Sequence, residues 1–311
     1  MEDRLQSEER NDGEISGGET REEKVRKIIE LVAQSEISSI QSVVSGVIKV
    51  INDRGSSAKD LKDLIEIDPP LTAKVLKVAN SAYYYSPARI SEIQHAVIWI
   101  GFDALKEIVL SQKVWEVFGK DEAINGYSRA SLWKHSVAVA LLGKMIYRRE
   151  FGERGENVYA AGLLHDIGII VEHQFLQKNF EDIVRKARAE KKNLSQIESE
   201  VLTYTHSDLG RVLAQHWNFP EEFGVGIGHH HSPKGIGEDF SRFASTLYVA
   251  DCVCQERGIG YADAPYRDGA LFRKCLKRLD IKSYALDLIV KDVEQEVARM
   301  EDQGIFQYEA R

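Results

Sequence analysis

The sequence predicts an all-α protein in which an N-terminal helical bundle packs on a C-terminal helical domain. From residue 23 onward, nearly every segment has apolar residues three and four positions apart, and no segment alternates between apolar and polar residues for long, as a strand would. Helix boundaries are also marked, because Asp68 precedes Pro69 and Pro70, and Asn218 stands just before Pro220. The 311 residues suffice for one large domain or two modest ones.

The apolar spacing places the helices in chain order. We expect them at about residues 23–35, 38–52, 57–67, 70–80, 92–100, 102–118, 129–150, 157–167, 177–191, 195–216, 220–230, 241–256 and 281–301. The loop from Lys120 to Ser128 separates a subdomain at 24–120 from one at 128–311, because every histidine except His95 follows it. Residues 1–23 hold nine acidic and three basic side chains and few apolar ones, so we expect a disordered acidic tail at 1–23.

The charge balance excludes several classes of protein. The formal net charge is −8, and most of it lies in the tail. A chain without a basic stripe is not typical of a nucleic-acid-binding protein, so we expect no nucleic-acid partner. We find no secretory signal, no apolar run long enough to cross a membrane, and only three cysteines, too few for a disulfide framework. We therefore expect a cytoplasmic protein with no membrane partner.

Several histidines lie where a helix would bury them. His135 and His206 each share an apolar stripe with leucines three or four residues away. Burying an imidazole costs free energy unless something satisfies it, and a lone one is more often a hydrogen-bonded core residue than a metal ligand. We expect His173 and His216, which lie outside this pattern, at the surface or at a boundary.

The grouping of histidines with carboxylates favours metal binding. His165 and Asp166 interrupt an apolar helix end, three histidines occupy 229–231, and Asp251 lies within another apolar run. Neutral imidazoles combined with carboxylates suit iron, manganese, zinc or nickel better than calcium or magnesium.

The order of these residues resembles the ligand order of the HD superfamily of metal-dependent phosphohydrolases, especially its HD-GYP branch. The matching residues are His135, His165, Asp166, His206, His230, His231 and Asp251. The resemblance implies a divalent metal centre of one or two ions, with iron or manganese favoured over zinc or nickel. With two ions, His135, His165, Asp166 and Asp251 would hold the first and His206, His230 and His231 the second, and Asp166 would bridge them. His229 is the alternative ligand if the register shifts by one residue.

Further motifs resemble the HDOD family, the HD-related output domains of bacterial signalling proteins. They are Ile67–Tyr83, Ile93–Leu110, Ala161–Gly168, and Trp217–Pro220 followed by His230–Pro233. The resemblance covers about residues 37–255. It implies that the C-terminal domain is HD-like and that the chain transmits a signal through contacts with an unidentified signalling protein.

Three departures from the enzyme pattern bear on function. HD-GYP hydrolases have a phosphate-contacting lysine where this sequence has Ile169, and they have a Gly-Tyr-Pro element where this chain reads Ser232–Phe240 without one. Ser131 stands where some of these enzymes have a carboxylate. We therefore expect a signal-transduction module that binds metal without ordinary turnover. The alternatives are a metal-dependent phosphohydrolase acting on a nucleotide or cyclic dinucleotide, with Asp166 catalytic, and a metal-free scaffold.

Overall fold

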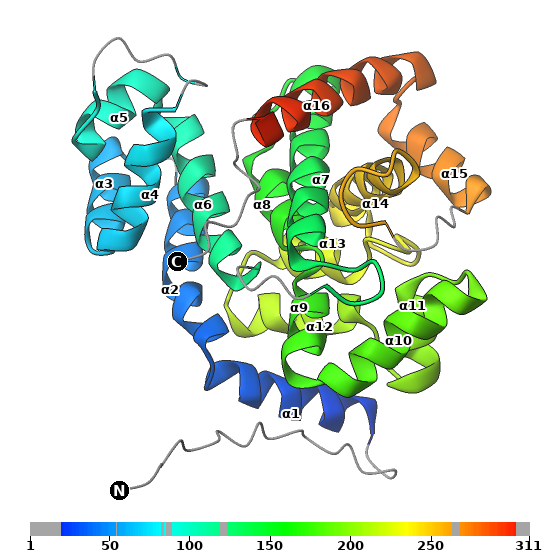
Figure 1. The fold of residues 1–311 in the computed structure, drawn as a ribbon. Helices are drawn as coiled ribbons and strands as arrows, with labels where there is room; N and C mark the ends of the chain where they lie inside the picture. Colours follow the sequence, from blue (N-terminus) through cyan, green and yellow to red (C-terminus); the bar gives the residue numbers. More distant parts are fainter. Residues whose placement is uncertain are drawn as a thin grey trace, which may run out of the picture.

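The computed structural model describes residues 20–53, 55–81, 84, 89–118, 123–262 and 268–302. These residues form sixteen α-helices and no β-strand, which confirms the all-α prediction (Figure 1). The helices are α1 (Arg21–Ala33), α2 (Glu36–Asn52), α3 (Ala58–Glu66), α4 (Pro69–Ala79), α5 (Ile93–Ile100), α6 (Phe102–Phe118), α7 (Arg129–Glu150), α8 (Glu156–Leu164), α9 (Ile167–Phe175), α10 (Gln177–Glu190), α11 (Leu194–Val201), α12 (His206–His216), α13 (Glu221–Gly228), α14 (Glu238–Glu256), α15 (Gly269–Leu279) and α16 (Ser283–Asp302).

Helix α7 is the central helix of the C-terminal half. It is buried along most of its length and packs against α8, α14 and α16 (Figure 1). Gly162 allows α8 to come close to α7, because a Cβ at this position would lie 2.6 Å from the Cα of Ala140. The apolar side chains of this packing continue into one buried cluster that also includes the N-terminal helices.

The N-terminal helices form two unequal parts. Helices α3, α4 and α5 pack on one another and on α6, and α2 packs on α6 and on α8 (Figure 1). Helix α1 instead packs on α9 and α12, and Arg21 forms an ion pair with Asp208 there. The predicted tail at 1–23 lies outside the described residues up to position 19, and α1 already begins at Arg21 because Thr20 and Glu23 form a capping box.

Two expected helices are divided. The helix expected at 157–167 ends at Leu164, and a separate helix, α9, follows it. The helix expected at 195–216 is interrupted after Val201, because Thr203 has a positive φ of 72° and Thr205 caps a new helix with Asp208. Helix α15 lies where no helix was expected. Within the described ranges, no helix combines the length and apolar character that crossing a membrane requires.

Candidate metal centre

The break between α8 and α9 positions the central carboxylate. His165 and Asp166 occupy this break, so both side chains leave the backbone where the chain changes direction. Gly168 brings the start of α9 against the start of α12, because a Cβ on Gly168 would lie only 2.0 Å from the backbone oxygen of His206. A glycine at this position therefore places His206 beside Asp166.

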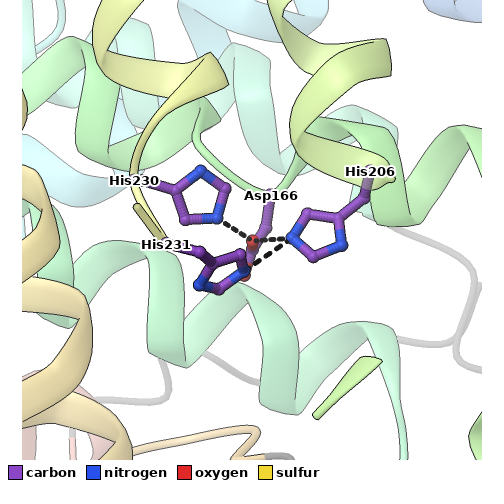
Figure 2. Close-up of side chains that lie close together, drawn as sticks. All are labelled: Asp166, His206, His230 and His231. Atoms are coloured by element: carbon purple, nitrogen blue, oxygen red, sulfur yellow. Dashed lines mark hydrogen bonds and ion pairs between the residues drawn. The ribbon is translucent and has the colours of Figure 1, made fainter. Parts of the chain in front are cut away.

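Asp166 faces two groups of histidines with its two oxygens. Its Oδ2 lies 3.2 Å from Nε2 of His165 and 3.9 Å from Nε2 of His135. Its Oδ1 lies 3.4 Å from Nε2 of His230 and 3.6 Å from Nε2 of His206, as Figure 2 shows. Within each group, one potential ligand atom per residue lies within 4.8 Å of all the others, and His231 belongs to the second group. The arrangement suits a carboxylate that bridges two ions.

Asp251 lies at the edge shared by the two groups. Its Oδ1 is 3.0 Å from Nε2 of His135 and 4.0 Å from Nε2 of His165, and its Oδ2 is 3.2 Å from Nδ1 of His231. All seven side chains expected as ligands therefore lie together, whereas His229 belongs to neither group. Six of the seven are almost fully buried, and His231 retains 24% side-chain exposure.

The hydrogen bonds of His165 and His230 leave one nitrogen of each ring available. Nδ1 of His165 donates to the backbone oxygen of Gly162 at 2.7 Å, and Nδ1 of His230 donates to that of Ile227 at 2.6 Å. Nε2 of each ring is buried without a hydrogen-bond partner among the described residues. In its neutral form, each ring would keep its proton on Nδ1 and direct the lone pair of Nε2 toward Asp166, which is the form of histidine that binds a metal ion, so these residues fit such an ion.

Comparison with known proteins places the chain in a family. The model of the HDOD domain matches residues 37–233, more than half of the chain. The chain belongs to the HDOD family. It is similar to an HDOD domain protein of unknown function from Geobacter sulfurreducens, with 25% identity, a TM-score of 0.73, and coverage of 93% of this chain and 99% of that one.

Three further proteins are similar to this chain, two of them as solved structures. A phosphohydrolase candidate from Shewanella amazonensis SB2B is 24% identical, with a TM-score of 0.61 and coverage of 85% of this chain and 91% of that chain. A candidate signal transduction protein from Marinobacter aquaeolei VT8 is 20% identical, with a TM-score of 0.68 and coverage of 93% and 66%. An uncharacterized Treponema pallidum protein is 24% identical over 221 residues, which span 70% of this chain but 42% of the relative.

The pKa values of three side chains in the His/Asp centre of this HDOD protein favour the binding of cations. Burial alone would raise the pKa values of Asp166 and Asp251, but neighbouring histidines hold both well below their ordinary range. Burial, aided by the charge of His231, lowers the pKa of His230 to about 3. Both carboxylates are therefore ionised and His230 is neutral near pH 7, as metal ligation requires.

Glu198 supports His206 from behind, a role that the sequence pattern did not suggest. This carboxylate on α11 is fully buried and accepts hydrogen bonds at 2.8 Å from both Nδ1 and the backbone nitrogen of His206. The proton is thereby held on Nδ1, and Nε2 faces Asp166. Burial and the charge of Glu198 raise the pKa of the neighbouring Glu172 well above its ordinary value, which favours the neutral form of Glu172.

His173 corrects an expectation, because it is buried rather than at the surface. It lies on α9, which was not predicted, and Nε of Arg129 donates to its Nδ1 at 3.0 Å while its ring stacks on Phe180. Burial, reinforced by the charge of Arg129, lowers the pKa of His173 to about 4. His173 belongs to neither histidine group, and His216 is exposed.

The free space around the centre is unequal on its two sides. On one side, Ile169 and Leu194 contribute to the lining of a cavity of about 10 Å³, which holds about one water molecule. Beyond His231 and Gln255, a pocket of about 260 Å³ has Asp251 in its wall, and Lys234 is the one cation among its described lining residues. The larger free space next to the centre therefore lies beyond the His231 edge.

Proposed function

We propose that this HDOD protein is a signal-transduction module whose His/Asp centre binds two divalent transition-metal ions and that acts through contacts with a signalling protein. The observation that carries the proposal is the pair of histidine groups facing the two oxygens of Asp166, each group with a buried Nε2 atom that has no hydrogen-bond partner among the described residues. Imidazole and carboxylate donors favour iron or manganese, with zinc or nickel next.

The residues divide between the two ions by proximity. His135, His165 and Asp251 lie on the Oδ2 side of Asp166, and the other three histidines, His206, His230 and His231, complete the Oδ1 side. Bound metals in such a set supply positive charge and lower the pKa of coordinated water. The cavity beside Ile169 has a volume of only about 10 Å³, and its described lining includes no lysine or arginine, so it offers little room and no cationic side chain of that kind to a phosphate group, which favours a regulatory role over turnover.

One observation favours a second candidate function, metal-dependent phosphohydrolysis. The pocket beside His231 brings a lysine, a serine and several amides next to the centre, so a small phosphoester could reach the ions from this side. The substrate class for this alternative is a nucleotide or a cyclic nucleotide, and Asp166 would help to hold metal ions, which would supply an activated water for hydrolysis.

Metal analysis combined with an activity panel tests the proposal. We expect about two transition-metal ions per chain in the purified protein and in Asp182→Asn, an exposed control, and at most one in Asp166→Asn. We expect no release of phosphate or linear product from nucleotides and cyclic dinucleotides. Absence of metal from the wild type would refute the metal centre. Turnover that follows metal content and disappears in Asp166→Asn would replace the regulatory function by the phosphohydrolase.

A further inference from the structure

A further cavity, which has no histidine among its described lining residues, lies where the N-terminal helices meet the C-terminal ones. Its volume is about 390 Å³, and its walls come from α4 and α6 on one side and from α7, α8 and α16 on the other. In Figure 1, α6 is the helix that stands between α4 and the C-terminal group. Junctions between packed units are common places for small-molecule sites, and this volume lies in the usual range for them.

Most of the cavity wall is apolar and adaptable. Ile108 of α6 is buried, and Leu141, Met145 and Met300 are partly buried side chains at the edge of the core that contribute to the lining. Methionine side chains adjust to ligands of different shape because they have three rotatable bonds and a polarizable sulfur. The wall therefore suits the flexible hydrocarbon part of a small organic molecule.

The formal charges of the lining balance, because Glu107 and Glu296 offset Lys144 and Arg148, but the four side chains are not paired equally. Glu107 and Lys144 form an ion pair across the junction, so their charges cancel. Burial raises the pKa of Glu107, and the charges of both Lys144 and Arg148 oppose that rise, which places Arg148 near the same pair. Arg148 has no ion-pair partner among the described residues, whereas the lining Glu296 pairs with Arg299 at 3.4 Å. Arg148, which is exposed, is therefore the lining cation that has no ion-pair partner among the described residues and can meet an anion.

We propose that this junction cavity binds a small amphipathic organic anion, with a hydrocarbon body against the methionines and one anionic head group at Arg148. A ligand of this kind touches α6 and α7 at once, so its binding free energy favours the arrangement in which the N-terminal and C-terminal helices are docked. The site is separate from the His/Asp centre and needs no metal, so its test does not depend on the proposed function.

The test uses 8-anilinonaphthalene-1-sulfonate as a fluorescent probe on the full chain, with octanoate and 1-octanol as competitors. The two competitors have the same chain length and differ in charge. We expect one saturable probe site, displaced by octanoate with a dissociation constant on the order of 1 mM. Arg148→Gln should weaken octanoate about fivefold, the value of one exposed charge pair, and leave octanol unchanged.

Two further variants separate this cavity from other apolar surfaces. Arg149→Gln is the matched control, because Arg149 pairs with Asp292 and does not line the cavity, so it should bind octanoate like the wild type. Ser111→Trp should abolish probe binding by filling the space, since the Ser111 hydroxyl bonds only its own helix at Ile108. The proposal is overturned if no saturable site exists, if Ser111→Trp binds the probe as tightly as wild type, or if Arg148→Gln binds octanoate as tightly as wild type.

Discussion

Replacing Glu198 by glutamine should weaken metal binding although Glu198 is not itself a ligand. The carboxylate accepts from Nδ1 and from the backbone nitrogen of His206, each at 2.8 Å, in a fully buried position. An amide can accept only through its oxygen, so its NH₂ group would face one of these donors. We expect a loss of about 1–3 kcal/mol in the free energy of unfolding from the unsatisfied group. We also expect about 10–100-fold weaker metal affinity, because the ring of His206 is no longer held in one tautomer.

Competition with a chelating dye measures that affinity, and thermal unfolding of the apo protein shows whether the variant is folded. Glu200→Gln is the matched control on the same helix: Glu200 has 42% side-chain exposure and pairs with Lys186 and Lys192 at the surface. This control should change stability by no more than about 0.5 kcal/mol. Equal metal affinity in folded Glu198→Gln and Glu200→Gln would refute the positioning role of Glu198.

Three further outcomes follow from the structure. Saturating metal at about 1,000 times its Kd should stabilise the wild type by about 4 kcal/mol in chemical denaturation, and Asp166→Asn should lose most of that gain; an equal gain in both would contradict the bridging role. Gly168→Ala should cost at least about 1–3 kcal/mol by pushing α9 from α12, whereas Gly269→Ala, whose Cβ would meet only the end of Arg273 at 3.4 Å, should be nearly neutral in the same assay. The pKa of His173 is about 4 in the folded chain, against an ordinary value of 6.5, so its contribution to the free energy of unfolding is complete above pH 6.5 and is lost as the pH falls toward 4. Between pH 7 and pH 5, the free energy of unfolding of the chelated wild type should therefore fall by up to about 2 kcal/mol more than that of His173→Gln. Equal losses in urea titrations would contradict this.

The parts of the site that rest on long, unbroken helices could be anticipated from the sequence. His135 and Asp251 interrupt apolar stripes of α7 and α14, and the structure places both on the inner faces of those helices. The helical class and the HDOD family were predicted from spacing and motifs and are confirmed. The ligand set remains a prediction, although its side chains lie together.

The helix breaks could not be anticipated, and with them the role of Glu198. Apolar spacing continues across Val201 to His206, so the pattern predicts one helix, in which Glu198 and His206 would stand about 12 Å apart along the axis. The positive φ of Thr203 and the cap at Thr205 instead turn the chain, and the two residues meet. The same limit hid α9 and therefore the burial of His173.

The bonds that orient His165 and His230 have a consequence for protein engineering. Each ring donates to a carbonyl three residues earlier in its own chain, at the last turn of a helix. Such a histidine ring is oriented by a four-residue segment through a hydrogen bond within its own stretch of chain. A histidine placed just after a helix end is thus a transferable unit, and two such helix ends facing one carboxylate would be a simple starting scaffold for a designed binuclear site.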